Sequence, residues 1–221
     1  MESSKSLPQS EHTIRESLDS WNDCGYKIEY FGEDLKAIIL GEIHEVREII
    51  RKQLKLIAQI KPDFVLHEFG AAWVYDPKNK QFKPQIGRQF NIVDRLRGPD
   101  SFPGGLISLS HNYGFKIVGC DLSDGELTNA EKRFALQNPQ KYKLIKRDPV
   151  GLTPQSDELI PYRDLKMAEL ITAYQNKSTK PVITVLGNAH ARNIHNGKLI
   201  QGKGFGYAYV DQTSESESTD I

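Results

Sequence analysis

The chain has 221 residues, about one and a half times the usual length of a domain, so we expect one domain with elaborations. Lys plus Arg and Asp plus Glu both total 29, and this zero net charge argues against a general nucleic-acid binder and a polybasic membrane-surface protein. Hydrophobic residues make up 38% of the chain and charged residues 26%, which is enough apolar material for a sizeable core. The sequence has no apolar run of membrane-span length, no secretory signal and only two cysteines, so we expect a cytoplasmic protein.

The two ends of the chain are polar. Residues 1–20 lead us to expect a flexible N-terminal arm. Residues 213–221 (TSESESTDI) are rich in Ser and acidic residues and have no apolar period, so we expect a disordered tail there. Between these ends, residues 21–212 are expected to form a single α/β domain.

The first half of this domain shows strand and helix patterns in turn. Residues 26–31 (YKIEYF) and 35–40 (LKAIIL) flank a Gly-Glu-Asp turn, which predicts the two strands of a hairpin. Apolar residues within 45–60 trace one face of a helix, and residues 63–68 (DFVLHE) predict a short buried strand. Residues 71–104, rich in Pro and Gly, break this rhythm, and we expect a lid or substrate loop there.

The second half of the domain repeats the alternation. The predicted elements are a helix over 105–113 ended by Gly114, a strand over 115–122, a polar helical stretch over 128–146, a helix over 161–176, and strands over 181–186 and 206–210. Strands that alternate with helices are typical of crossover units. The sequence therefore predicts an α/β fold with a mostly parallel central sheet flanked by helices, a helical or loop insertion and an antiparallel edge.

Chemically distinctive residues follow four of the predicted strands. In open α/β sheets the ligand lies beyond the carboxyl ends of the strands. The four strand ends read Gly41-Glu42-Ile43-His44, His67-Glu68, Cys120-Asp121 and Gly187-Asn188-Ala189-His190. Two strands thus end in the same Gly-x-x-His form, and Arg163-Asp164 begins the helix that leads to the last of them. We expect these strand ends to form one site.

The glycines, histidines and glutamate of this set suit the activation of water. Gly41 and Gly187 let the chain turn off the strand and approach a substrate closely. His44, His190 and Glu68 can hold a divalent metal such as Mn, Zn, Co or Fe. The two histidines can instead act as general base and orienter for a water without any metal.

Two further charged residues belong to the candidate set. Arg163 suits a developing oxyanion or a substrate carboxylate. Asp121 could contribute to substrate binding or simply cap the next turn. A lone histidine at a strand end is more often structural, so it is the repetition of Gly-x-x-His that favours a functional site.

The ordered set of Gly41-x-x-His44, Glu68, Arg163-Asp164 and Gly187-x-x-His190 resembles the Tiki/TraB superfamily, which is grouped with erythromycin esterases and ChaN-type haem-binding proteins. The resemblance implies an α/β fold with a polar site built from these residues. Tiki-type members are metal-dependent peptidases, which implies a metal near the two histidines and the glutamate. Erythromycin-esterase-type members are hydrolases with a histidine as base on water and no required metal, whereas ChaN-type members bind haem.

Two functions follow as expectations. The first is a hydrolase acting on a small-molecule or peptide substrate, with catalysis by His44, Glu68, Arg163 and His190. The second is a non-catalytic binder of haem, iron or another metal complex, with candidate axial contacts at Tyr75, His111 or Tyr113. The final strand, expected at a sheet edge, could pair with a second copy to form a homodimer. We expect no nucleic-acid partner and no membrane partner.

Overall fold

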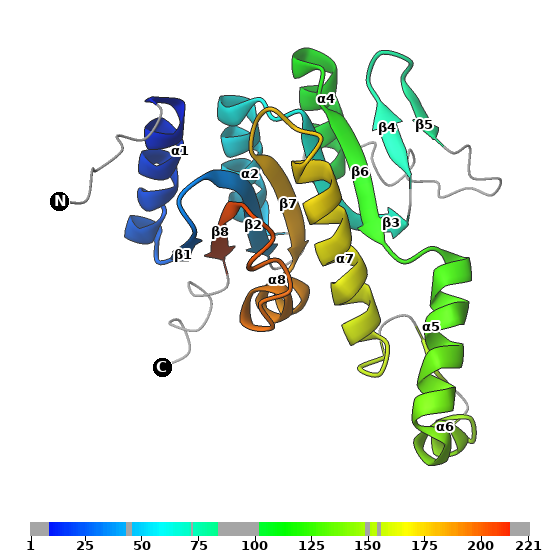
Figure 1. Cartoon of the computed structure of the whole chain (residues 1–221). Helices are drawn as coiled ribbons and strands as arrows, with labels where there is room; N and C mark the ends of the chain where they lie inside the picture. The colour runs from blue at the N-terminus through cyan, green and yellow to red at the C-terminus, as the bar shows by residue number, and fades with distance from the viewer. Residues whose placement is uncertain are drawn as a thin grey trace.

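The computed structural model describes residues 9–42, 46–71, 73–83, 102–148, 151–153 and 156–212. Its helices are α1 (Gln9–Asp19), the short η1 (Asn22–Cys24), α2 (Arg47–Ile60), α4 (Phe102–Tyr113), α5 (Asp124–Gln137), α6 (Pro139–Ile145), α7 (Ile160–Gln175) and α8 (Asn188–Asn196). Its strands are β1 (Lys27–Phe31), β2 (Leu35–Glu42), β3 (Phe64–Ala71), β4 (Val74–Asp76), β5 (Gln81–Lys83), β6 (Lys116–Asp121), β7 (Val182–Gly187) and β8 (Gly206–Asp211). The strands form one sheet, and helices cover both of its faces (Figure 1).

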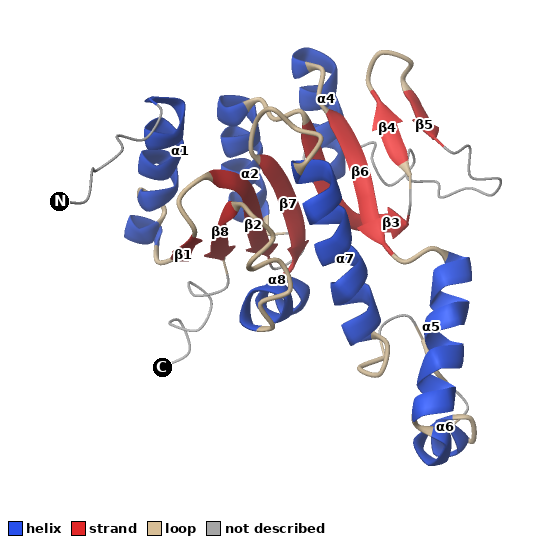
Figure 2. Cartoon of the chain, viewed as in Figure 1, coloured by secondary structure: helices blue, strands red, loops and turns tan. Residues whose placement is uncertain are grey.

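The strands are ordered β1-β8-β2-β7-β3-β6-β4-β5 across the sheet. The strands β8, β2, β7, β3 and β6 run parallel to one another, whereas β1 joins β8, and β4 joins both β6 and β5, in antiparallel pairs. The predicted α/β fold with a mostly parallel sheet and an antiparallel edge is thus confirmed (Figure 2). The helices predicted over 45–60, 105–113 and 161–176 correspond to α2, α4 and α7.

Two apolar layers hold the sheet between its helices. Ile38 and Leu40 of β2 face the layer shared with α2 and α4, while Ala37 and Ile39 face the layer shared with α7 and α8. All four side chains are fully buried, which is the alternating pattern of a strand covered on both faces. Burial of each large side chain of this kind contributes about 1.5–3 kcal/mol to stability.

The position of β8 corrects two predictions. The strand β8 lies between β1 and β2, so the strands predicted over 26–31 and 35–40 do not form a hairpin. The final strand is likewise not at a sheet edge, so the expected homodimer contact through residues 206–210 is wrong. The physical reason is burial: β8 is buried almost throughout, whereas β1 is exposed or half-buried and suits the edge. A period of two predicts a strand but does not identify its neighbours.

The expected flexible arm over residues 1–20 is wrong for its second half. Residues 9–19 form α1, whose Leu18 is fully buried and whose Ile14 packs against the core. The carboxylate of Glu11 accepts hydrogen bonds from Arg15 at 2.9 Å and from the backbone N–H of Leu35 at 3.3 Å. These contacts tie α1 to the start of β2.

Two other predicted segments lie partly or wholly outside the described residues. Residues 71–104 were expected to form a lid or substrate loop, and this stretch contains β4, β5 and the first residues of α4. Residues 84–101, the first eight residues and the predicted tail over 213–221 all lie outside the described residues.

Gly206, at the start of β8, is expected to tolerate no side chain. A Cβ atom there would lie 2.8 Å from the backbone oxygens of Phe31 and Asp34. We therefore expect Gly206→Ala to lower the free energy of unfolding by about 1–3 kcal/mol. At Gly125 of α5 an added Cβ would meet nothing within 4 Å, so Gly125→Ala should be neutral or stabilise by up to about 1 kcal/mol. Urea denaturation compares the two variants, and equal stabilities would contradict this account.

Candidate functional site

Most of the predicted site residues lie together at the carboxyl ends of four neighbouring strands. The strands β2, β7, β3 and β6 are consecutive in the sheet and parallel. Gly41 lies near the end of β2, Glu68 near the end of β3, and Asp121 and Gly187 end β6 and β7. His44 follows the last residue of β2 by two positions and lies outside the described residues. Sequence reasoning thus grouped correctly the strand ends that the structure describes.

Glu68 lies beside the first turn of α8. Its Oε2 accepts a hydrogen bond from the backbone N–H of Gly187 at 2.6 Å. Because Gly187 is the N-cap of α8, this carboxylate lies at the positive end of the helix dipole, where negative charge is stabilised. Glu68 is therefore held by Gly187, which is the glycine of the second Gly-x-x-His motif.

His190, the third residue of α8, is held by a buried carboxylate from α7. Its Nδ1 lies 2.6 Å from Oδ1 of Asp164, and Oδ2 of Asp164 accepts a hydrogen bond from Asn193 at 2.9 Å. His190 is 8% exposed and Asp164 is 4% exposed. A carboxylate next to Nδ1 favours the tautomer with its proton on Nδ1, which leaves the Nε2 lone pair to act as base or ligand. Sequence reasoning gave Asp164 no role of its own, although it adjoins Arg163.

Arg163 is fixed against the end of β6. Its Nε lies 3.0 and 3.1 Å from the two carboxylate oxygens of Asp121, and its Nη2 lies 2.6 Å from Oδ2. Burial lowers the pKa of Arg163, but the hydrogen bonds and charge of Asp121, with the charges of Glu68 and Asp164, more than offset this and leave the pKa raised. The guanidinium thus lies among three carboxylates. The structure gives Asp121 the role of fixing Arg163, and substrate binding by Asp121 stays a prediction.

Gly41 allows α8 to pack directly on β2. A Cβ atom at this position would lie 2.6 Å from Oδ1 of Asn188 and 3.0 Å from the Cβ of Ala191. Gly41, the glycine of the first Gly-x-x-His motif, therefore leaves room for α8, the helix that carries His190. Close approach of a substrate to Gly41 stays a prediction.

A buried polar cluster that the sequence did not indicate adjoins the same strand end. Nε2 of Gln53, on α2, donates hydrogen bonds to Glu42 and to Gln212, each at 2.7 Å. The backbone N–H of Gln212 donates to the carbonyl of Gly41 at 3.0 Å. Gln53 is fully buried, and Glu42 and Gln212 are 6% and 1% exposed. The available signal was a glutamine within the apolar stripe of the helix, since Gln53 falls on the same face as Ile49.

Cys120 is not suited to be a nucleophile. Burial raises the pKa of its thiol well above the usual value, and the charges of Glu68 and Asp121 raise it further. A thiolate is the reactive form of cysteine, so a fully buried neutral thiol is inert.

The residues expected to contact haem lie on two other elements: Tyr75 is on β4, and His111 and Tyr113 are on α4. The hydroxyl of Tyr75 lies 2.5 Å from Nε2 of His111, and the two rings stack with centroids 5.8 Å apart. Tyr75 is only 4% exposed, whereas Tyr113 is 42% exposed with Lys61 above its ring. Two of the three candidate axial ligands therefore bind each other, and a haem cofactor stays a prediction.

The predicted metal set is incomplete in the part of the chain that is described. No group of three His, Cys, Asp or Glu side chains with the geometry to hold an ion occurs among those residues. Glu68 and His190 supply two donors, whereas a catalytic zinc usually has three protein ligands. The third predicted ligand, His44, lies outside the described residues. A metal at this site therefore stays a prediction.

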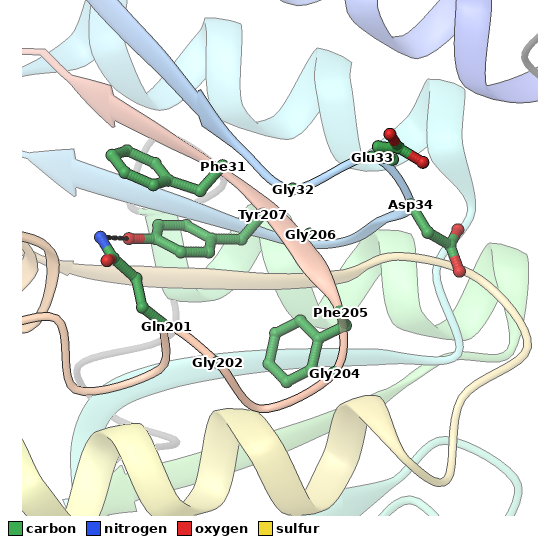
Figure 3. Close-up of a pocket in the computed structure, with 10 residues that line it drawn as sticks. All are labelled: Phe31, Gly32, Glu33, Asp34, Gln201, Gly202, Gly204, Phe205, Gly206 and Tyr207. Carbon is green, nitrogen blue, oxygen red and sulfur yellow. Dashed lines mark hydrogen bonds between the residues drawn. The ribbon is translucent and has the colours of Figure 1, made fainter. Parts of the chain in front are cut away.

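A shallow pocket of about 510 Å³ lies at the opposite, amino edge of the sheet (Figure 3). The turn before β2 and the loop before β8 form it. Phe31 and Tyr207 stack in it with ring centroids 5.1 Å apart, while the carboxylates of Glu33 and Asp34 point away from these rings (Figure 3). Within it Nε2 of Gln201 donates a hydrogen bond to the hydroxyl of Tyr207 at 3.3 Å (Figure 3). Because the pocket lies at the amino ends of β2 and β8, it is distinct from the predicted site.

Comparison with known proteins adds no relative. None of the helices in the described ranges has the length and apolar character needed to cross a membrane. No protein-family model, curated protein or solved structure matches the chain. The resemblance to the Tiki/TraB superfamily therefore stays a prediction, and the function has to be argued from the site.

Proposed function

We propose that the protein is a hydrolase that activates water at the carboxyl edge of its sheet for attack on the carbonyl carbon of an ester or peptide substrate. The observation that carries this proposal is the pair of His190 and Asp164, in which a buried carboxylate holds Nδ1 of a nearly buried imidazole. In this arrangement Nε2 takes a proton from water, and the carboxylate stabilises the imidazolium that forms.

In this proposal Glu68 and Arg163 act beside the base. Glu68 is bound to the first turn of α8, within one helical turn of His190, and accepts a hydrogen bond that orients the attacking water. Arg163, fixed by Asp121, supplies positive charge that stabilises the oxyanion formed when water attacks the carbonyl. The tetrahedral intermediate then collapses with cleavage of the C–O or C–N bond to the leaving group, and the proton on His190 passes to that leaving group, which restores the base.

Metal dependence is a separate proposal about the same residues. If His44 joins Glu68 and His190, the three would supply the ligands of a catalytic metal, which lowers the pKa of a bound water. The hydrolysis assay distinguishes the two forms of the proposal when it is run after chelation and after addition of Mn, Zn, Co or Fe.

A panel of p-nitrophenyl esters and short peptides tests the proposed function. We expect the wild-type protein to hydrolyse at least one of these classes and His190→Ala to lower kcat by about 100-fold or more. His12 on α1 offers a matched control, because its side chain is 64% exposed and far from the strand ends in sequence. His12→Ala should leave the rate unchanged. Absence of hydrolysis across the panel, with and without each metal, would overturn the proposal.

A further inference from the structure

The helices α5 and α6 form a hairpin that projects from the body of the protein. The helix α5 leaves the sheet after β6, and α6 lies at the end of α5 farthest from the sheet (Figure 1). The two helices are joined by an edge-to-face contact of Phe134 with Tyr142, at 6.5 Å, and by a hydrogen bond from Tyr142 to Glu131 at 2.6 Å. Residues 132–147, which we call the hairpin tip, therefore have a defined structure.

The zero net charge of the chain hides a strong local excess of positive charge in the hairpin tip. The tip has no Asp or Glu, and its basic residues are Lys132, Arg133, Lys141, Lys143, Lys146 and Arg147. All six of these residues are exposed. Within the described part of the chain only Lys141 has an ion pair, with Glu158 at 3.0 Å. The tip thus carries five exposed cationic side chains that have no ion pair among the described residues.

The two most exposed leucines of the described residues also lie in the hairpin tip. Leu136, near the end of α5, is 83% exposed, and Leu144, on α6, is 65% exposed. Each lies two residues from the aromatic side chain that joins the helices, so each is turned away from the α5–α6 contact. Exposed large apolar side chains flanked by lysine and arginine are the composition of surfaces that insert into a lipid interface.

In place of the expectation that the protein has no membrane partner, we propose that the hairpin tip docks on an anionic lipid surface, with Leu136 and Leu144 entering the headgroup region and the basic side chains contacting lipid phosphate and carboxylate groups. Lysine and arginine are attracted to the negative surface of such a membrane, which is the charge complementary to the tip. A nucleic acid would contact the cations but offers no place for two leucines.

Co-sedimentation of the full chain with vesicles tests this proposal. We expect binding to vesicles of phosphatidylcholine with phosphatidylserine, little binding to phosphatidylcholine alone, and weaker binding as salt concentration rises. The double variant Leu136→Ser/Leu144→Ser should lower the partition coefficient by about tenfold or more. Lys143→Glu/Arg147→Glu should lower it by a similar factor.

Matched variants elsewhere control for surface hydrophobicity and net charge. Leu165 of α7 is 49% exposed, so Leu165→Ser removes an exposed leucine outside the tip. Lys55 and Lys116 are exposed, so Lys55→Glu/Lys116→Glu makes the same change in net charge. Both controls should bind as the wild type does. Failure of the wild type to bind the anionic vesicles, equal loss in the controls, or loss with the charge variant but not with the leucine variant would overturn the proposal, the last outcome indicating a polyanionic partner such as a nucleic acid.

Discussion

Replacement of Arg163 by Met is expected to lower the free energy of unfolding by about 3–5 kcal/mol. The side chains of Arg163 and Asp121 are only 12% and 18% exposed, and three contacts of 2.6–3.1 Å join them. Methionine retains much of the apolar stem but removes the cation. The carboxylate of Asp121 would then remain part-buried without this partner, near the charges of Glu68 and Asp164, which already act on Arg163.

Urea denaturation measures this effect, with a double variant as the control. Arg163→Met/Asp121→Leu removes both charges and should recover most of the stability that the single variant loses. A loss below about 1 kcal/mol in the single variant is typical of an exposed ion pair and would contradict a pair that fastens α7 to β6.

The second large effect is expected at Asp164. An asparagine at position 164 has one oxygen, which accepts the hydrogen bond from Asn193. Its NH₂ group then faces Nδ1 of His190 and donates a hydrogen bond to it, which favours the tautomer with the proton on Nε2. That tautomer cannot accept a proton from water. We therefore expect Asp164→Asn to lower kcat of the proposed hydrolysis by about 100-fold, close to the loss in His190→Ala, because Asp164 acts only through His190.

The tautomer of His190 can be measured without a substrate. Nitrogen-15 NMR of the imidazole should show the neutral ring protonated at Nδ1 in the wild type and shifted toward Nε2 in Asp164→Asn. Asp157→Asn is the control, because Asp157 is an exposed carboxylate shortly before α7. A wild-type ring protonated at Nε2 would contradict the role given to Asp164, whatever the outcome of the hydrolysis assay.

The central strands and their helices could be predicted because their signals are local. The apolar run of β2 and the stripe of α2 lie within single segments, and the period alone identifies each element. The strand ends could then be grouped, because parallel strands of one sheet place their carboxyl ends at the same edge. Glu68, Asp121 and Gly187 could therefore be expected at the same strand ends from the sequence alone.

The partners of individual elements could not be predicted, because they depend on contacts between distant segments. The strand β8 joins β2 across about 170 residues of chain, and nothing within residues 206–210 indicates that neighbour. The helix α1 is polar along most of its length, and its order comes from a few contacts such as that of Leu18 with the core. Sequence periodicity is too weak over so short a segment to indicate them.

The support of the site was missed for the same reason. Sequence reasoning identified His190 and Arg163 by residue type and motif. It could not show that Asp164 holds His190 or that Gln53 links Glu42 to Gln212, since each contact joins different elements. These supporting residues belong to the tertiary packing rather than to any motif, so only the structure reveals them.

The most direct test of the hydrolase proposal is the ratio of kcat for His190→Ala to kcat for the wild type, on the best substrate of the ester and peptide panel. The proposal predicts a ratio of about 0.01 or lower in a variant that still unfolds cooperatively, with a lowered midpoint because the buried Asp164 loses His190 and keeps only Asn193 as a hydrogen-bond partner among the described residues. A variant that retains the wild-type kcat would show that His190 is not the base and would contradict the proposed function.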